Sequence, residues 1–400
     1  MTARDTTTTA KAADAERQFD VFVHGTVFLD IIFTGLGSLP TGGTEIWAEG
    51  MGSCPGGIAN LAVATGRLGL STSLAAAFGD DDYGDFCWRT LEQQEGIDLS
   101  HSRRFEHWHS PVTVSMATPG DRAMVTHGHA PPVPVAELIG TPPRARAAIV
   151  DLSESHPIHV AGTGAGPGDG AATATWVDAA RANGTKIFAD VGWDPSGQWS
   201  PAILDQLSVC HAFMPNATEA MAYTRCGNAK DALYTLADLV PLAVVTNGAE
   251  GAMAIDSETG EEAHVPAVRV KALDATGAGD VFGAAIVLGT LKGWPLANRL
   301  AFAGVCSALA VQQFGGSLAA PGWGDISDWW SCTKGVGPTD AYHASLLRRY
   351  AFLDDVTPPA PLASVRRAQA TVARLADIDH TDAAPQRHTR IPPHRGPRSR

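Results

Sequence analysis

The architecture of this 400-residue chain is centred on Asp274-Ala275-Thr276-Gly277-Ala278-Gly279-Asp280, which continues as Val281-Phe282-Gly283-Ala284-Ala285-Ile286-Val287-Leu288. Residues 268–273 alternate apolar and polar side chains, which predicts a strand. Small and apolar residues follow the quoted stretch without a helix breaker until Gly293, which predicts a buried helix. A glycine-rich turn therefore lies where a helix begins. Unpaired backbone N–H groups and the helix dipole make such a position favourable for an anion.

Two residue types in this turn, glycine and aspartate, suggest chemistry. Gly277 and Gly279 lack a Cβ atom, so the backbone can approach a ligand closely. A carboxylate at Asp280 would repel an anion unless it had a role there, and the simplest role is a general base that deprotonates an attacking hydroxyl. One alternative is an ordinary helix start, capped by Thr276, with Asp280 as a favourable first-turn acid. A dinucleotide fingerprint is disfavoured because Phe282 stands at its third glycine position.

The seven residues 274–280 closely resemble the C-terminal signature of the ribokinase-like (PfkB-type) carbohydrate kinases. The resemblance implies that Asp280 is the catalytic base and that Gly277, Ala278 and Gly279 form an anion hole. It extends over about residues 20–330, where further segments match the family in order.

The front half of the chain carries the residues expected to bind the acceptor. Asp30 lies within an apolar run, and an unpaired buried carboxylate is costly, so it either pairs locally or meets a polar ligand. The resemblance implies that it binds two sugar hydroxyls, which a carboxylate accepts well. Glu154 follows the buried strand predicted at 147–152, and the family often has an acid here that reaches the sugar.

Residues 55–60 predict a glycine turn that opens a helix. They resemble the family's N-terminal signature, although Pro55 replaces its first glycine. The resemblance implies that Gly56, Gly57 and Asn60 contact sugar hydroxyls. Without a ligand, Asn60 would cap the helix start and the glycines would form a plain turn.

The nucleotide side is expected further along the chain. Asn216 and Glu219 resemble the family's N-x-x-E motif, whose glutamate organises Mg²⁺ through water, and they also fit a helix capping box. Mg²⁺ favours a few carboxylates and retained waters. The resemblance further implies nucleotide contacts for Thr246, Gly248 and Thr276.

A monovalent cation remains an open question in the sequence. In some relatives the backbone around Asp274 and Thr276 holds such an ion, which makes Asp274 a candidate site for K⁺. Ala319 supplies no hydroxyl where some relatives have Ser, so dependence on K⁺ is left undecided.

Composition excludes several classes of protein. The net charge of −13 argues against nucleic-acid binding, and no apolar run approaches the ~20 residues that a membrane-spanning helix needs. Six cysteines lie scattered without a C-x-x-C pair, and the N-terminus lacks the apolar core of a secretory signal, so we expect reduced thiols in a cytoplasm. The histidines at 101, 107 and 109 cluster without zinc ligand spacing. Those at 127 and 129 follow a strand pattern, which is compatible with the lining of a pocket, but a solvated loop is the favoured interpretation.

The expected organisation has four parts: a disordered leader at 1–18, a kinase domain at 19–330, a helical extension at 331–380 and a disordered basic Pro/Arg-rich tail at 381–400. Alternating strands and helices predict a mostly parallel sheet with helices on both faces. The resemblance implies the ribokinase-like three-layer α/β/α fold, with a small β-sheet lid from insertions at about 35–52 and 110–130. Within these insertions, residues 45–48 are strand-like, and the alternating runs at 112–117 and 122–126 around a Gly-Asp turn predict a hairpin. Relatives often form homodimers through their lid sheets.

The expected function is ATP-dependent transfer of the γ-phosphoryl group to a hydroxyl, most simply the primary CH₂OH of a sugar or sugar-like molecule, with ATP and Mg²⁺ as cofactors. A nucleoside kinase of the same family is one alternative. The other is a regulator that binds a sugar or nucleoside on the same fold without catalysis.

Overall fold

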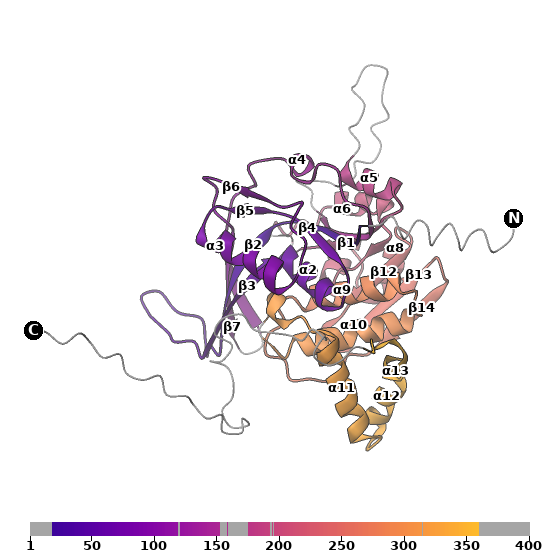
Figure 1. Ribbon diagram of the computed structural model, residues 1–400. Helices are drawn as coiled ribbons and strands as arrows, with labels where there is room; N and C mark the ends of the chain where they lie inside the picture. Colours follow the sequence, from indigo (N-terminus) through magenta and orange to yellow (C-terminus); the bar gives the residue numbers. More distant parts are fainter. Residues whose placement is uncertain are drawn as a thin grey trace, which may run out of the picture.

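A computed structural model describes residues 18–118, 121–152, 158, 175–192, 194, 196–313 and 315–359 (Figure 1). Glu154, nearly all of the expected leader, the expected tail and part of the expected extension lie outside these residues. Among the described helices, none is both long and apolar enough to cross a membrane.

The main sheet has eight strands in the order β14-β13-β12-β11-β10-β9-β1-β4. The pairs from β4 to β12 are parallel, and β13 and β14 join antiparallel at one edge. The strands are β1 Phe19–His24, β4 Thr72–Ala75, β9 Ala145–Leu152, β10 Lys186–Val191, β11 Ala212–Phe213, β12 Leu242–Thr246, β13 Ala252–Asp256 and β14 Glu261–Val265.

Helices cover both faces of this sheet because its strands are apolar on both sides. In β9, Ala147 and Ile149 point into one core, and Ala148 and Val150 point into the other. The first core is closed by α2 (Ile58–Arg67), α9 (Ala278–Leu291) and α10 (Leu296–Ala310); the second is closed by α5 (Trp176–Ala182), α7 (Ala217–Thr224) and α8 (Ala229–Ala237). The predicted three-layer α/β/α fold is therefore confirmed.

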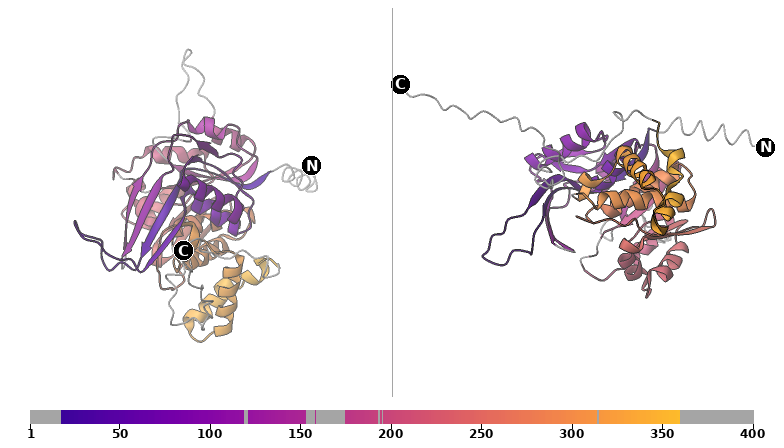
Figure 2. Two further views of the ribbon diagram at one scale, coloured as in Figure 1. Left: turned by 60° about the vertical axis from the view of Figure 1, so that its left-hand side comes forward. Right: turned by 90° about the horizontal axis from the view of Figure 1, so that it is seen from below.

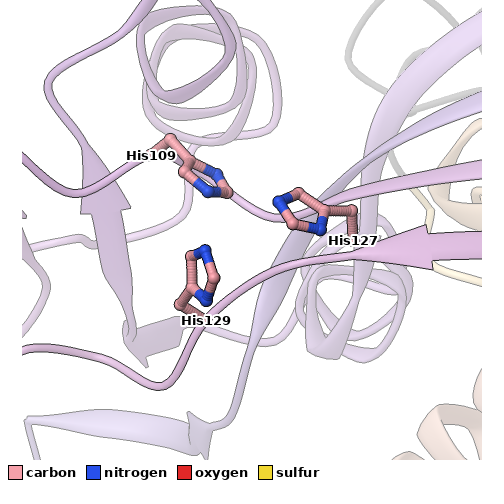
Figure 3. Close-up of side chains that lie close together, drawn as sticks. All are labelled: His109, His127 and His129. Atoms are coloured by element: carbon pink, nitrogen blue, oxygen red, sulfur yellow. The ribbon is translucent and has the colours of Figure 1, made fainter.

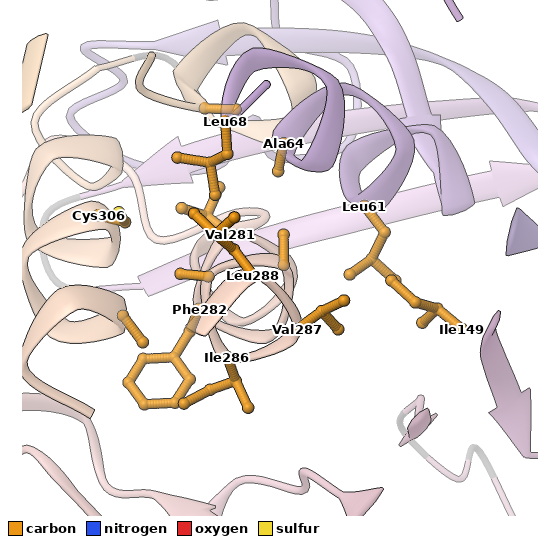
Figure 4. Packing of buried hydrophobic residues seen from close by; sticks show 14 of the residues in the cluster. Leu61, Ala64, Leu68, Ile149, Val281, Phe282, Ile286, Val287, Leu288 and Cys306 are labelled. Atoms are coloured by element: carbon orange, nitrogen blue, oxygen red, sulfur yellow. The ribbon is translucent and has the colours of Figure 1, made fainter. Parts of the chain in front are cut away.

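Helix α9 is buried on all sides, as its sequence predicts. Every residue from 281 to 289 is buried, and Ile286 and Val287 are fully covered (Figure 4). Burial of each such side chain stabilises the fold by about 1.5–3 kcal/mol. The helix is thus a rigid mount for Asp280 in its first turn.

The lid is a separate four-stranded sheet in the order β3-β2-β7-β8 (Figure 2). Its strands are β2 Val27–Thr34, β3 Gly50–Gly57, β7 Val112–Thr118 and β8 Asp121–His127. The predicted hairpin around residues 119–120 is confirmed by the antiparallel pairing of β7 and β8.

Two details of the lid differ from expectation. The strand-like residues 45–48 form no strand, because they lie in an exposed loop where Trp47 is 87% accessible and packs on nothing that would order a strand. Gly56 and Gly57 are not a turn after a strand but the last residues of β3, which pairs with β2 and runs directly into α2. Asp30 therefore belongs to the lid sheet, in strand β2.

The strand predicted at residues 268–273 is wrong. The edge strand β14 ends at Val265, and the following segment is extended without pairing to a strand in the described structure. The N–H of Arg269 donates instead to the Tyr342 hydroxyl (2.8 Å), and the N–H of Leu273 donates to the Val311 carbonyl (2.7 Å). A side chain and the end of a helix accept these backbone hydrogen bonds in place of a neighbouring strand. The alternation of apolar and polar residues therefore does not indicate a sheet here.

Three C-terminal helices form a protrusion beside α10 (Figure 1): α11 Trp323–Val336, α12 Ala341–Tyr350 and α13 Leu353–Val356. The boundary expected at residue 330 falls inside α11. Tyr350 and Leu353 are fully buried in the same core as α10. The remaining elements are β5 Ala77–Gly79, β6 Arg103–Phe105, α3 Asp82–Arg89, η1 Thr90–Gln94, α4 Val135–Ile139, α6 Ala202–Asp205, η2 Gln206–Val209, η3 Gly248–Glu250 and η4 Gly316–Ala319.

Candidate active site

The candidate site lies where the N-terminus of α9 faces the carboxyl ends of β9 and β10. Asp151 stands near the end of β9 and Asp190 near the end of β10. Both carboxylates interact electrostatically with Asp280 in the first turn of α9. Ligands of open α/β sheets bind at this edge, outside the carboxyl ends of the strands.

A hydrogen bond joins the two sequence signatures. Asn60 Nδ2, in the first turn of α2, donates to Asp280 Oδ2 at 2.9 Å across 220 residues of sequence. Asn60 Oδ1 is buried and has no hydrogen-bond partner among the described atoms. A buried amide oxygen without a donor is costly, so this atom is suited to accept a hydroxyl of a bound ligand.

Asp30 reaches the same place from the lid. It is 7% exposed, and its Oδ2 would lie 3.6 Å from a Cβ placed on Gly316. A Cβ on Gly56 would collide with the Asp30 carboxylate, so only glycine leaves room for it. Gly57 follows with φ of 61°, a conformation that favours glycine. The two glycines therefore make space for Asp30 and for the entry into α2.

The loop before α9 is held by Asp274. Its Oδ1 accepts hydrogen bonds from the Thr276 N–H (2.9 Å) and hydroxyl (2.8 Å), and its Oδ2 accepts one from the Gly315 N–H (3.0 Å). The N–H of Gly316 donates to the Thr276 carbonyl at 2.9 Å. Asp274 thus fastens the glycine-rich turn to a second glycine pair.

The interpretation of Thr276 as helix cap is wrong. The N-cap is Gly277, with φ of 74° and no side-chain cap, because the Thr276 hydroxyl is bonded to Asp274. The first-turn N–H groups of α9 therefore receive no side-chain acceptor from the N-cap residue.

The three expected anion-hole residues differ in accessibility. Gly279 is exposed, and a Cβ there would meet nothing within 4 Å. Gly277 is pressed against Gly316, whose Cα would lie 3.0 Å from a Cβ on Gly277. The Ala278 N–H lies 3.3 Å from the Ala275 carbonyl and closes a turn. The open face of the turn is consequently at Gly279.

The surroundings raise the pKa of both central carboxyls. Burial raises the pKa of Asp280 to about 6, with a further rise from the Asp151 charge; the hydrogen bond from Asn60 and the positive charge of Arg122 oppose this. Burial also raises the pKa of Asp30 to about 7, and the charges of Asp280 and Asp274 add to it. A carboxyl with a pKa near 6 is suited to general base catalysis near neutral pH.

Acidic groups line the strand ends beyond Asp280. The Asp151 side chain is exposed to solvent. Many protein atoms nevertheless surround its carboxyl, and this partial desolvation raises the pKa of Asp151 to about 6. Burial raises the pKa of Asp190 well above its usual value, and the pKa of Glu219 is also raised by burial. Asp190 interacts electrostatically with Asp151 and Glu219, and neighbouring carboxyls of this kind suit a hydrated divalent cation.

Asn216 and Glu219 form the expected capping box at the start of α7. The Asn216 N–H donates to Glu219 Oε2 (2.9 Å), and the Glu219 N–H donates to Asn216 Oδ1 (3.0 Å). Asn216 also bridges Thr246 at the end of β12, which places it beside η3 and Gly248. Within the described residues, no three of these acids bring their ligand oxygens within 4.8 Å of one another.

The structure adds two residues that sequence reasoning missed. Asp151 stands in the apolar strand at 147–152, and that setting is the same signal that drew attention to Asp30. Arg122, on lid strand β8, acts electrostatically on Asp280. No local pattern marks Arg122, because its position depends on how the lid packs. The position of Glu154 lies outside the described residues.

Known proteins are similar to this chain in sequence and in fold. The sequence profile of the pfkB family carbohydrate kinases matches residues 20–322. The aminoimidazole riboside kinase of Salmonella typhimurium is 29% identical, covering 67% of this chain and 85% of that protein. The fructokinase of Klebsiella pneumoniae is 30% identical, covering 67% and 89% respectively.

Solved structures show the same architecture. The Arabidopsis thaliana ribokinase complexed with ribose and ATP superimposes with a TM-score of 0.62 at 21% identity, covering 78% of this chain and 98% of that one. The Thermotoga maritima ribokinase gives 0.61 at 20% identity, covering 78% and 99%. The profile match spans most of the chain and includes both signatures that meet at the Asn60–Asp280 hydrogen bond, and the protein therefore belongs to the pfkB family of carbohydrate kinases.

Proposed function

We propose that this carbohydrate kinase transfers the γ-phosphoryl group of ATP to a primary hydroxyl of a sugar, with Asp280 as the general base. The observation that carries the proposal is the meeting of Asp280, Asn60 and Asp30 at the N-terminus of a buried helix. A hydroxyl held between Asp30 and Asn60 would lie beside the carboxylate that removes its proton. The open N-terminal turn would receive the phosphoryl group.

The acceptor is held by hydrogen bonds that the site leaves available. Asn60 Oδ1 lacks a partner among the described atoms, and the ionised Asp30 carboxylate accepts two hydroxyl groups. Gly56 and Gly57 admit the sugar close to the backbone. Glu154 is proposed as a further sugar ligand. A polyhydroxylated acceptor satisfies these polar groups better than an apolar alcohol would.

Phosphoryl transfer needs charge stabilisation more than covalent chemistry. The N–H groups around Gly277, Ala278 and Gly279 are proposed to stabilise the transferring group, with the exposed Gly279 approaching it most closely. For Ala278 this requires release of its long turn contact to Ala275.

The nucleotide is proposed to lie along the loops after β11 and β12. Asn216, Thr246, Gly248 and Thr276 would contact ATP, and Glu219 would hold Mg²⁺ through water together with Asp151 and Asp190. Bound Mg²⁺ supplies charge neutralisation to the phosphates. Both oxygens of Asp274 already accept protein hydrogen bonds, so its proposed role is to shape the loop, and a K⁺ series tests any cation there.

The proposed acceptor class is a pentose or hexose, since the relatives include a ribokinase and a fructokinase. The presence of an aminoimidazole riboside kinase among them makes a riboside the second candidate. The described cysteines are all free thiols, which supports the proposed cytoplasmic location.

An assay of ATP consumption over a panel of sugars, sugar acids and ribosides tests this function. One class should support turnover, and Asp280→Asn should lower that turnover by about 10²–10⁴ while keeping ATP binding. Asp238→Asn, an exposed aspartate at the end of α8, is the matched control and should behave as wild type. Near-normal turnover in Asp280→Asn would refute the base. Sugar binding without turnover in the wild type would favour the non-catalytic regulator instead.

We also propose that a second copy of the chain pairs with the lid sheet. Its outer strands β3 and β8 are sheet edges, and such edges favour pairing with another chain. The lid strands also expose Met51 (36%), Met124 (53%) and Val125 (63%). A symmetric partner would cover these side chains.

A further inference from the structure

Three histidines converge where the β7–β8 hairpin of the lid begins and ends (Figure 3). His109 precedes β7, His127 ends β8 and His129 follows it. Their ring centroids lie 4.9–5.2 Å apart, and each ring offers a nitrogen within 4.8 Å of the others. Arg122, which acts on Asp280, lies five residues before His127 on β8, or roughly 17 Å along an extended strand.

The backbone around this histidine cluster is firmly held. The Ser110 N–H donates to Asp81 Oδ2 (2.7 Å), and the Ser110 hydroxyl accepts from the Gly79 N–H (2.9 Å). Trp108 Nε1 donates to the Ala130 carbonyl at 3.0 Å. This bond ties the first segment of the cluster, residues 108–112, to the second, residues 127–130. These hydrogen bonds hold the backbone beside the histidines in one conformation, which favours a defined arrangement of their side chains.

The register of the lid hairpin brings the same segments together. Val112 pairs with His127 in the antiparallel β7–β8 ladder. A Cβ on Gly128 would lie 2.8 Å from Pro111 Cβ, so the chain between the two histidines of the second segment passes directly over the first. The convergence therefore follows from strand pairing and not from chance loop positions.

From this arrangement we propose that His109, His127 and His129 form a three-ligand site for a divalent transition cation of the Zn²⁺ type. Imidazole nitrogen suits Zn²⁺, whereas Mg²⁺ prefers oxygen ligands. His109 Nδ1 lies 3.3 Å from the Ser110 carbonyl, and donation there leaves Nε2 as the metal-binding atom. Water would occupy the fourth position, as in sites with three protein ligands.

The geometry requires only a modest closure. Tetrahedral Zn²⁺ with Zn–N bonds of about 2.05 Å places ligand nitrogens about 3.4 Å apart. The ligand nitrogens now lie within 4.8 Å of one another, and rotation of the three exposed side chains would bring them to this separation. In the described part of the chain, no other group of His, Cys, Asp and Glu brings three ligand atoms this close. The alternative interpretation is three solvated rings that stack without an ion.

Titration of the chelator-treated full-length protein with Zn²⁺ in excess Mg²⁺ separates the two interpretations. We expect wild type to bind one equivalent tightly, and His109→Ala, His127→Ala and His129→Ala each to lose that equivalent. Changes in outer-shell groups alone cost about 10–100-fold in metal affinity, so loss of a ligand should cost at least as much. His264→Ala, an exposed histidine on β14, is the matched control and should keep wild-type binding.

Hydrogen exchange on the wild-type protein gives a second measurement that needs no variant. Zn²⁺ would link the segment that enters the lid to the one that leaves it, so amides at 108–112 and 127–130 should exchange more slowly with the ion bound. Retained stoichiometric binding in all three variants overturns the site. So does a wild-type protein whose exchange at these amides is unchanged by Zn²⁺.

Discussion

The Asp280 carboxylate must be ionised to accept a proton, and its surroundings place its pKa at about 6. Turnover at saturating sugar should therefore rise with pH as this carboxyl ionises in the substrate complex, and level off once it is ionised. Asn60 donates a hydrogen bond that lowers this pKa. Asn60→Ala should shift the acidic limb of the profile to higher pH, measured as turnover against pH.

The control for this shift is Asp280→Asn, which has no carboxyl to titrate and should lack the limb in its residual activity. An unchanged limb in Asn60→Ala would contradict the pKa coupling, whatever that variant does to the Michaelis constant for the sugar.

Adding one methyl group at Gly56 should affect the binding of sugar but not the binding of ATP. In Gly56→Ala the new Cβ collides with the Asp30 carboxylate, which must move. Overpacking of this kind costs about 1–3 kcal/mol. We expect the Michaelis constant for the sugar to rise by at least roughly tenfold, which corresponds to 1.4 kcal/mol, while ATP affinity changes little.

Gly227→Ala is the matched control for this substitution, because a Cβ there meets nothing within 4 Å. Equal effects of Gly56→Ala on sugar and ATP would argue against a sugar-specific position for Asp30.

At the scale of elements, a buried ion pair holds α2 against η1 and η4. Arg67 at the end of α2 makes two hydrogen bonds to Glu95 (2.8 and 2.9 Å) and also donates to the Ala320 carbonyl (2.6 Å). Removing one partner of a buried pair costs about 3–5 kcal/mol. Arg67→Ala should lower the free energy of unfolding by this amount, measured by urea denaturation.

Arg89→Ala serves as the control, since Arg89 is exposed at the end of α3 and its loss should change stability by less than about 0.5 kcal/mol. Equal stability of the two variants would contradict a stabilising role for the buried Arg67–Glu95 pair.

Helices α2 and α9 and the β7–β8 hairpin were predictable because local patterns and tertiary structure agree there. Residues 268–273 failed because period-two alternation cannot distinguish a paired strand from an extended segment that Tyr342 and Val311 satisfy. That Asp280, Asn60 and Asp30 lie close together could be expected from the family resemblance, and their roles stay predictions. Arg122 was not, because only the packing of the lid brings it near Asp280.

At the scale of the whole molecule, the lid offers a test of association. If a second copy covers Met124 and Val125, light scattering should give the mass of a dimer, and Val125→Glu should give that of a monomer because a buried carboxylate at the interface is costly. Tyr234→Glu, an exposed position on α8, is the control and should remain dimeric. A wild-type monomer at micromolar concentration would contradict pairing through the lid.

Gly316 touches both halves of the chemistry at once. Its N–H holds the turn that would cradle phosphate, and the space beside its Cα borders Asn60 and Asp30. Any shift that a sugar imposes on this glycine is transmitted to the cradle. Thermodynamic linkage then applies: if bound sugar raises the affinity for ATP by some factor, bound ATP must raise the affinity for the sugar by the same factor. The two ligands should therefore communicate through a single backbone contact, and calorimetric titrations run in either order should return one shared cooperativity.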